Sequence, residues 1–355
     1  MDLKDLGISR TQRDYIEKNN IHENNIARVI RENRERYIIS TGDTDFEAEI
    51  TGNMRFAASS REDFPAVGDW VTMIEFDPGK AIINGILPRK SLLARQATGK
   101  TGEKQLIAAN VDTAFIMQSV DNNFNINRIE RYLTICNSGG IEPVVLLSKT
   151  DLVNEEVIEK LRSGLEKREK GLKYFLLSSL SGEGLDHITG YMQKGRTYCV
   201  MGSSGVGKST LINRLFDREI LDTNDISKST NKGKHTTTFR ELFITDTGSI
   251  IIDTPGMREL GITDDEEGIH STFEDIEKLA ENCRFSDCTH TGEKGCAVIE
   301  AVENGTIDVR SLDNYLRMKR EQEHYNSSIA ERRQKDREFG KMVKEVLKGK
   351  KGHKY

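Results

Sequence analysis

The residues best suited to carry chemistry form a glycine-rich segment that ends in lysine and serine. The pattern G-x-x-x-x-G-K-S occupies Gly202, Ser203, Ser204, Gly205, Val206, Gly207, Lys208 and Ser209, followed by Thr210. An apolar strand is expected before it and a helix after it, which is the context in which this pattern binds phosphate. The backbone amides would converge on a phosphate at the helix N-terminus, Lys208 would reach the β- and γ-phosphates, and Ser209 would ligate Mg²⁺. The alternative is a glycine-rich turn without a ligand, which this context disfavours.

A second phosphate-side pattern follows about 45 residues later. The apolar run 249–252 ends at Asp253, and Gly256 stands three positions further on. A carboxylate at such a strand end holds the Mg²⁺ shell, and the glycine amide contacts the γ-phosphate. Between the two patterns lies the hydroxyl-rich loop 233–238, which can close over Mg²⁺ while a γ-phosphate is present. Its three threonines are also compatible with an edge strand.

Two segments that precede the glycine-rich loop are candidates for binding a purine. Each follows an apolar run, the first at 148–151 and the second at 178–182. The Asp151 carboxylate could accept two hydrogen bonds from the N1 and N2 edge of guanine, which adenine does not offer, and the stem of Lys149 could lie over the ring. The nucleotide-binding candidates here are Ser148, Lys149, Asp151, Ser178 and Ser179.

A separate metal-binding pattern lies near residue 290. Cys283, Cys288, His290 and Cys296 offer three thiolates and one imidazole within 14 residues. This donor set favours tetrahedral Zn²⁺, and four protein ligands leave no position for water, so the site is expected to be structural. The alternative is a group of free buried cysteines.

The elements that position these residues fall into distinct regions. Between 113 and 201, apolar strands alternate with helical segments, which predicts an α/β domain with a mostly parallel sheet. From about 27 to 88 the chain breaks into short strands separated by glycines, which predicts a small OB-like barrel of five strands. Such barrels often bind nucleic acid, and many only pack against protein.

Composition and charge narrow the class of protein. The chain has 355 residues, 36% hydrophobic and 31% charged, with a net charge of −5 and five cysteines, which fits a multidomain globular protein with reduced thiols. We expect no membrane association and a cytoplasmic location, because no apolar run approaches a bilayer span and the start lacks a signal pattern. From residue 310 onward, 14 basic residues oppose 7 acidic ones. The pattern of this tail predicts a helix. Its basic side chains either only face solvent or form an arm that contacts RNA phosphates.

The order of the motifs along the chain is unusual and indicates a family. The purine-binding candidates precede the phosphate motifs, which is the reverse of an ordinary small GTPase. With a leading barrel, a K-H-T-T-T loop at 234–238 and a trailing Cys/His cluster, the chain resembles the RsgA family of circularly permuted GTPases. The regions expected from this are a helical extension (1–26), the OB-like barrel (27–95), a circularly permuted P-loop GTPase domain (96–270), a zinc-binding helical module (271–310) and a basic helical tail (311–355).

The resemblance also implies an activity. It implies hydrolysis of GTP to GDP and phosphate with Mg²⁺, during late maturation of the small (30S) ribosomal subunit, by a monomer that binds rRNA. Motif alignment favours Thr237 as a second Mg²⁺ ligand. Met257 stands where many GTPases place a glutamine that orients water, so His235 is the expected catalytic residue, although it could instead only bond the loop backbone. Ser148 replaces the usual asparagine of the guanine motif, so a supporting contact there is expected to differ. Two rival functions stay open: a P-loop kinase for a small molecule, and an RNA-binding nucleotide sensor with negligible turnover.

Overall fold

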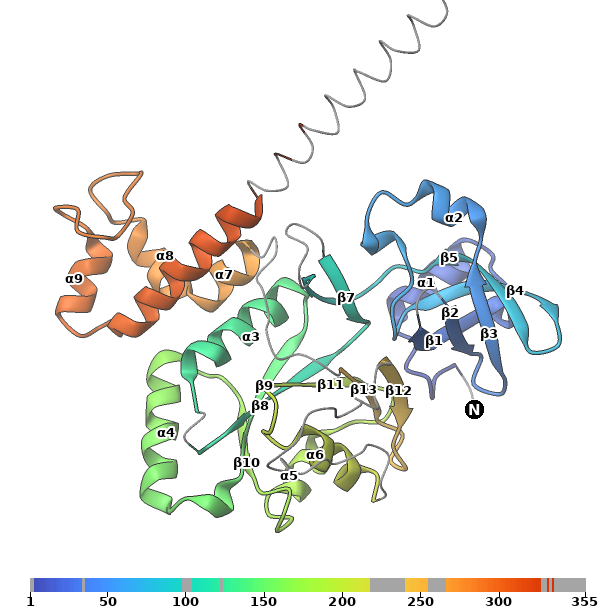
Figure 1. The fold of residues 1–355 in the computed structure, drawn as a ribbon, viewed down its shortest axis with the longest axis horizontal. Coiled ribbons are helices and arrows are strands. Elements are labelled where there is room, and N and C mark those ends of the chain that lie inside the picture. Colours follow the sequence, from blue (N-terminus) through green and yellow to red (C-terminus); the bar gives the residue numbers. More distant parts are fainter. Residues whose placement is uncertain are drawn as a thin grey trace, which may run out of the picture.

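The structure is a computed structural model, and it describes residues 3–33, 36–97, 104–121, 124–217, 240–254 and 266–326, together with residues 331 and 334. Its centre is a sheet with helices on both faces (Figure 1). The strand order is β10-β9-β8-β11-β13-β12, and all neighbours are parallel except β12, which is antiparallel to β13. The strands are β8 (Thr113–Ser119), β9 (Glu142–Ser148), β10 (Tyr174–Leu177), β11 (Thr197–Met201), β12 (Arg240–Ile244) and β13 (Ile250–Asp253). The predicted α/β domain is confirmed.

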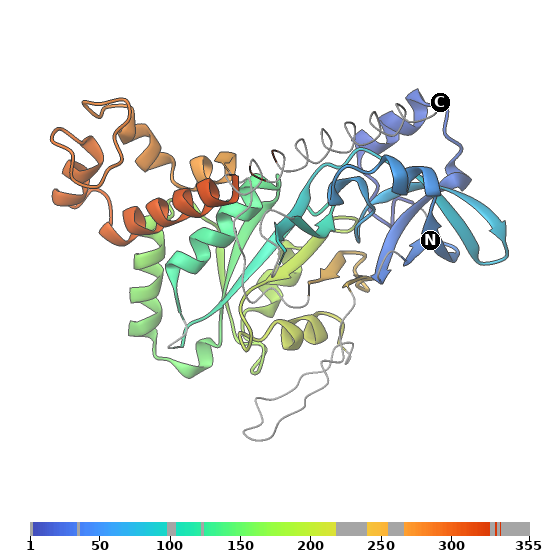
Figure 2. The same ribbon diagram turned by 45° about the horizontal axis from the view of Figure 1, so that its top comes forward.

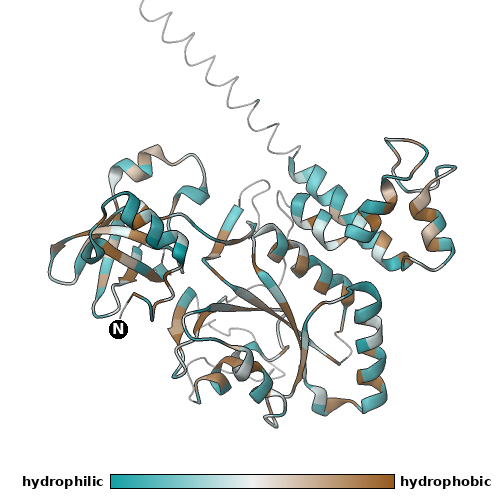
Figure 3. Cartoon of the chain, turned by 180° about the vertical axis from the view of Figure 1, so that it is seen from behind, coloured by the Kyte–Doolittle hydropathy of each residue, from teal (hydrophilic) through white to brown (hydrophobic). Residues whose placement is uncertain are grey.

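Successive side chains of the buried strands point to opposite faces of this sheet, and each face packs into an apolar core of its own. In β8, Ala114 and Ile116 pack into one apolar core, whereas Phe115 and Met117 pack into another on the opposite face. The first core includes residues of α3 (Ile126–Ser138) and α4 (Glu155–Arg168); the second includes residues of α5 (Leu185–Tyr191) and α6 (Lys208–Leu215). Apolar residues accordingly concentrate in the strands, and polar residues cover the outer faces of the helices (Figure 3). Burial on both faces explains why these strands read as continuous apolar runs.

The N-terminal region confirms the predicted barrel. Its described strands are β1 (Ile26–Asn33), β2 (Arg36–Ser40), β3 (Asp45–Ile50), β4 (Trp70–Asp77) and β5 (Lys80–Ile86). They run in the order β1-β2-β3-β5-β4, and pairing of β4 with β1 closes the barrel. Helices α1 (Arg10–Lys18) and α2 (Gly52–Ala57) accompany it, and the ribbon of β6 (Leu92–Gln96) and β7 (Lys104–Ala109) leads to the central domain. Among the residues that the structure describes, no helix has the length and apolar character needed to span a bilayer.

The barrel and the central sheet are continuous through β1. This strand pairs with β12 of the central sheet, at Arg31 opposite Glu241. Close to this junction the guanidinium of Arg28, which is fully buried, donates to the carbonyl oxygens of Leu6 and Gly68 at 2.5 and 3.1 Å and to Thr197 Oγ1 at 3.0 Å. Burial lowers the pKa of Arg28 to about 10, against the raising effect of Asp112 and Asp69. The side chain therefore joins the N-terminal segment, the barrel and the first residue of β11.

Replacing Arg28 by methionine is expected to lower the free energy of unfolding by about 3 kcal/mol, because the three acceptors lose their donor inside the protein. Urea denaturation at neutral pH measures this change. The matched control is Arg36→Met on the neighbouring strand β2, where the arginine side chain is 82% exposed and pairs with the exposed carboxylate of Glu49. That variant is expected to stay within about 0.5 kcal/mol of the unchanged protein. Equal midpoints for the two variants would show that the junction does not depend on Arg28.

A third region packs on the central domain through α3. It contains α7 (Glu266–Thr272), α8 (Glu274–Ala280), α9 (Ala297–Glu303) and a further helical segment at residues 309–326, which Figure 2 shows beside the central domain. Arg131 of α3 makes a bidentate ion pair with Glu321 of this segment, at 2.9 and 2.7 Å. The buried carboxylate of Glu130 accepts from Arg168 at 2.8 Å and from Asn314 at 2.5 Å. Helix α3 is thus held on its outer side by the segment 309–326.

Candidate nucleotide site and metal centre

The glycine-rich loop leaves the sheet at the end of β11, its central strand. Gly202 has a φ of +150°, and a Cβ atom there would lie 2.4 Å from the carbonyl oxygen of Met117. Gly207, with a φ of +100°, stands immediately before α6. Glycine therefore permits both the close exit from the strand and the entry into the helix. Ser209 and Thr210 follow in the first turn of α6 and are half-buried.

Two oppositely charged groups lie near the start of this loop. The Lys208 ammonium donates to the carbonyl oxygens of Gly202 at 2.9 Å and Ser203 at 2.7 Å. Asp253 ends β13, the parallel neighbour of β11. Burial raises the pKa of Asp253 to about 6, and the nearby charge of Lys208 acts in the opposite direction. The carboxylate is therefore ionised near neutral pH and lies within electrostatic reach of the ammonium, as a Mg²⁺-binding carboxylate beside a triphosphate requires.

The first predicted base segment reaches the glycine-rich loop directly. Ser148, at the end of β9, is buried, and its hydroxyl donates to the carbonyl oxygen of Val206 at 2.9 Å. Lys149 adopts a left-handed conformation with φ +63°, and Asp151 lies exposed in the short 3₁₀ turn that follows (Thr150–Leu152). A serine at position 148 thus ties the base segment to the phosphate loop.

The second predicted base segment is held by the helix that follows the phosphate loop. Arg214 of α6 donates to the carbonyl oxygens of Ser179 at 3.2 Å and Leu180 at 3.1 Å. Ser178 is fully buried, and its hydroxyl accepts from the backbone amide of Ser181 at 3.2 Å. Both predicted base segments are therefore held by one structural unit, the glycine-rich loop with α6.

Two hydroxyl groups in these segments fit a site for a polar ligand. Thr150 and Ser179 are each 8% exposed. Their side-chain oxygens are buried, and neither has a hydrogen-bond partner within the described structure. A buried hydroxyl without a partner costs free energy that a bound ligand or water can recover.

Two charged residues near this site were not predicted from the sequence. Asp121 lies just beyond β8, and its carboxylate accepts from the Lys149 ammonium at 3.2 Å. Arg128, on the first turn of α3, donates to the hydroxyl of Ser203 at 3.3 Å. The position of Asp121 at the carboxyl end of a strand beside β11 was the signal available for it, because ligands bind at that edge of a parallel sheet. Arg128 gave no comparable signal.

Three predicted site residues cannot be placed. His235, Thr237 and Gly256 lie outside the described residues, and so does Met257. Their roles stay predictions from the sequence.

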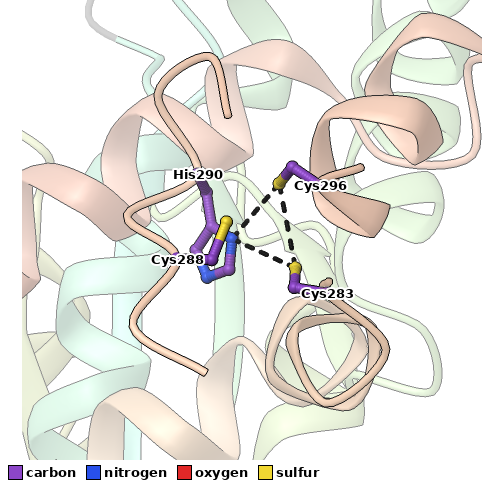
Figure 4. A group of neighbouring side chains, drawn as sticks. All are labelled: Cys283, Cys288, His290 and Cys296. Carbon is purple, nitrogen blue, oxygen red and sulfur yellow. Dashed lines mark hydrogen bonds between the residues drawn. The ribbon is translucent and has the colours of Figure 1, made fainter. Parts of the chain in front are cut away.

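The Cys/His pattern forms a compact cluster (Figure 4). The ligand atoms of Cys283, Cys288, His290 and Cys296 all lie within 4.8 Å of one another. Cys283 follows α8, Cys296 caps the start of α9, and the other two side chains come from the connecting loop. The sulfur atoms of Cys283 and Cys296 are 3.8 Å apart, and His290 Nδ1 lies 3.6 and 3.4 Å from them.

These separations suit a tetrahedral metal site. Four ligands around one ion, with metal–sulfur bonds of about 2.3 Å, place sulfur atoms about 3.8 Å apart. Burial lowers the pKa of His290, which favours the neutral imidazole that can ligate a metal. The cluster and the described helices around it share one apolar core that includes Phe273, Val298 and Leu312. A metal at this point would connect the end of α8, the following loop and the start of α9.

Comparison with known proteins agrees with this geometry. The RsgA GTPase family matches residues 86–263. The chain is 41% identical over 325 residues to the small ribosomal subunit biogenesis GTPase RsgA 1 of Bacteroides thetaiotaomicron, covering 91% of this chain and 90% of the relative. The crystal structure of YjeQ from Thermotoga maritima superimposes with a TM-score of 0.60 at 28% identity, covering 83% of this chain and 96% of that one. YloQ, described as a circularly permuted GTPase, has the same fold, with a TM-score of 0.55 at 23% identity, over 82% and 92% of the two chains. The expected resemblance is confirmed: the chain belongs to the RsgA GTPase family and is a circularly permuted GTP hydrolase.

Proposed function

We propose that this chain binds GTP between the segments 148–151 and 178–182 and the phosphate loop, and that it couples GTP hydrolysis to late maturation of the small ribosomal subunit. The observation that carries the proposal is the hydrogen bond from Ser148 to Val206, which joins the guanine-binding segment to the phosphate loop. Membership in the RsgA GTPase family supports GTP as the nucleotide and hydrolysis as the reaction at this site. The relatives' names, small ribosomal subunit biogenesis GTPases, support the cellular process. A cytoplasmic location is part of the same proposal.

Guanine recognition is assigned to the exposed carboxylate of Asp151. Guanine presents N1–H and N2–H donors on one edge, and a carboxylate accepts both. The unpartnered hydroxyls of Thr150 and Ser179 lie in the same two segments and would gain partners from the bound nucleoside or its water. A kinase for a small molecule has no requirement for such a carboxylate.

Hydrolysis requires positioning of the triphosphate, of Mg²⁺ and of water. Ser209 and Asp253 would hold Mg²⁺ together with Thr237, and the ion would neutralise charge on the β- and γ-phosphates. Lys208 would exchange its two carbonyl acceptors for phosphate oxygens. His235 would orient the attacking water or take its proton, since the methionine at position 257 has no hydrogen-bonding group for that task.

The Cys3His cluster is proposed to hold structural Zn²⁺. Cys283→Ser is expected to reduce bound zinc from one ion per chain to near zero and to destabilise the surrounding module by about 3 kcal/mol, since a lost metal is a recognised cause of large destabilisation. Elemental analysis reports the zinc, and limited proteolysis reports cleavage within 266–326. Asp287→Ser, which changes an exposed residue of the same loop, should retain both zinc and protease resistance. Full zinc content in Cys283→Ser would contradict the assignment.

Docking on rRNA is proposed for the chain as a whole, with the basic tail as one contact. The tail carries a charge of +7 from residue 310 onward, and phosphate contacts weaken steeply as salt rises. The test is GTP hydrolysis by the purified protein with and without small subunits over a series of salt concentrations.

Subunits should stimulate turnover, and stimulation should decline with increasing salt. His235→Ala should lose the stimulated rate while keeping GDP affinity. A rate that subunits do not change would exclude the ribosomal part of the proposal. Unchanged stimulated turnover in His235→Ala would remove the assignment of that histidine. Binding without any hydrolysis would favour a nucleotide sensor.

A further inference from the structure

We propose that Arg128 is a catalytic residue whose guanidinium binds the γ-phosphoryl group of GTP and stabilises its charge during hydrolysis. The inference rests on the proposed function, because it names a residue for that same reaction. Three observations support it: the contact between Arg128 and the phosphate loop, the polarity of that loop, and the rigid support of α3.

The contact places the guanidinium at the start of the loop. Arg128 is half-buried, and its Nη1 donates to the Ser203 hydroxyl at 3.3 Å. The carbonyl oxygen of the same Ser203 accepts from the Lys208 ammonium at 2.7 Å. Ser203 therefore lies between two cationic side chains, one from α6 and one from α3.

The loop has a phosphate end and a base end, and Arg128 lies at the phosphate end. Lys208 is the side chain that holds β- and γ-phosphates in this motif, and its ammonium lies at Gly202 and Ser203. At the other end, Val206 contacts Ser148 of the guanine-binding segment. The nucleotide must run from the Ser148 side to the Ser203 side, which brings its terminal phosphate toward Arg128.

The helix that carries Arg128 is held in place before substrate binds. Asn125 caps α3 by accepting from the backbone amide of Arg128 at 3.3 Å, and Ile129, Tyr132 and Leu133 are buried in the core beneath it. Two residues after Arg128, the buried carboxylate of Glu130 accepts from Arg168 at 2.8 Å and from Asn314 at 2.5 Å. A donor fixed in this way loses little free energy to reorganisation when charge develops on the substrate.

The reaction needs no further reagent. The oxygen of water bonds to the γ-phosphorus, the bond from that phosphorus to the bridging oxygen breaks, and its electron pair stays on GDP. The proton from water leaves with phosphate or solvent. Arg128 stays protonated throughout and donates hydrogen bonds to γ-phosphoryl oxygens, the role of an arginine supplied within the same chain.

The test compares unchanged protein, Arg128→Ala, Arg128→Lys and Arg131→Ala in three measurements. These are affinity for GDP, the increase in that affinity caused by aluminium fluoride, which mimics the transferring phosphoryl group, and the single-turnover rate for bound GTP. Arg131→Ala is the matched control. It removes a guanidinium from the same helix, but that guanidinium pairs with Glu321 and not with the loop.

Arg128→Ala should bind GDP within about twofold of the unchanged protein, lose the aluminium fluoride effect, and hydrolyse GTP about 100-fold more slowly. Arg128→Lys should retain part of the rate, because it keeps the charge without the planar fork. Arg131→Ala should keep both the rate and the aluminium fluoride effect. The inference is overturned if Arg128→Ala hydrolyses bound GTP at the rate of the unchanged protein. It is also overturned if the variant binds GDP and the complex of GDP with aluminium fluoride more weakly by the same factor.

If the alanine variant does not fold, Arg128→Lys decides the matter: an unchanged rate and an unchanged fluoride effect in that variant would overturn the inference. Failure of the unchanged protein to bind or hydrolyse GTP would instead refute the proposed function, so the two failures are distinguishable.

Discussion

Lys208→Ala is expected to weaken binding of both GDP and GTP by about 1,000-fold. The ammonium lies at the start of the phosphate loop and would form charge-assisted hydrogen bonds to the β- and γ-phosphates, each contributing about 2 kcal/mol. Its loss also takes away the cation near the half-buried carboxylate of Asp253, so that more negative charge faces the incoming phosphates. Together these effects amount to about 4 kcal/mol, which is a factor of about 1,000 in affinity.

Isothermal titration calorimetry with GDP and a non-hydrolysable GTP analogue measures this loss. Lys160→Ala, an exposed position in α4, is the control and should bind as tightly as the unchanged protein. Lys208 donates to two carbonyl oxygens of the glycine-rich loop, and these two bonds hold no group of a strand or helix interior, so the variant should fold with its secondary structure intact. Nucleotide affinity within threefold of the unchanged protein would mean that the phosphates bind elsewhere.

Segments whose pattern is local could be located from the sequence. The phosphate loop falls between β11 and α6 as expected, because an apolar strand, glycines and a helix lie in immediate succession. The Cys3His cluster also assembles as its spacing suggested, since all four ligands fall within 14 residues. The strands β10 and β11 begin and end where their apolar runs do.

Contacts between distant segments could not be predicted in this way. Strand β1 carries three charged residues within Arg28–Glu32 and gives no alternating pattern, yet it closes the barrel and continues into the central sheet through β12. Arginine is usually a surface residue, so nothing local indicated that Arg28 would be fully buried. Its three partners come from residues 6, 68 and 197, a set that only the folded chain defines.

In the candidate nucleotide site, too, local patterns were predictable and contacts between distant segments were not. The motif residues of the loop and the two base segments could be named, but the links between them could not. Ser148 looked like a departure from the guanine motif, and the structure gives it a contact with Val206. Asp121 and Arg128 belong to no motif and reach the site because β8 and α3 lie beside β11.

The second large effect is a change of base specificity in Asp151→Asn. The carboxylate accepts two hydrogen bonds from guanine, whereas an asparagine side chain offers one acceptor and one donor. Xanthine replaces the N2 donors of guanine by a carbonyl acceptor, so it is complementary to asparagine and repelled by aspartate. Sites built around hydrogen bonds discriminate by large factors, and we expect the variant to lose about 1,000-fold in GDP affinity while gaining affinity for XDP.

Recognition of guanine by a segment that precedes the phosphate loop can be measured by calorimetric titration of GDP and XDP into the unchanged protein and Asp151→Asn. Asp186→Asn, on the exposed start of α5, is the control for loss of a carboxylate. We expect strong preference for GDP in the unchanged protein and in the control, and preference for XDP in Asp151→Asn. If Asp151→Asn binds GDP as tightly as the unchanged protein and still rejects XDP, Asp151 does not recognise the base and the proposed guanine site is wrong.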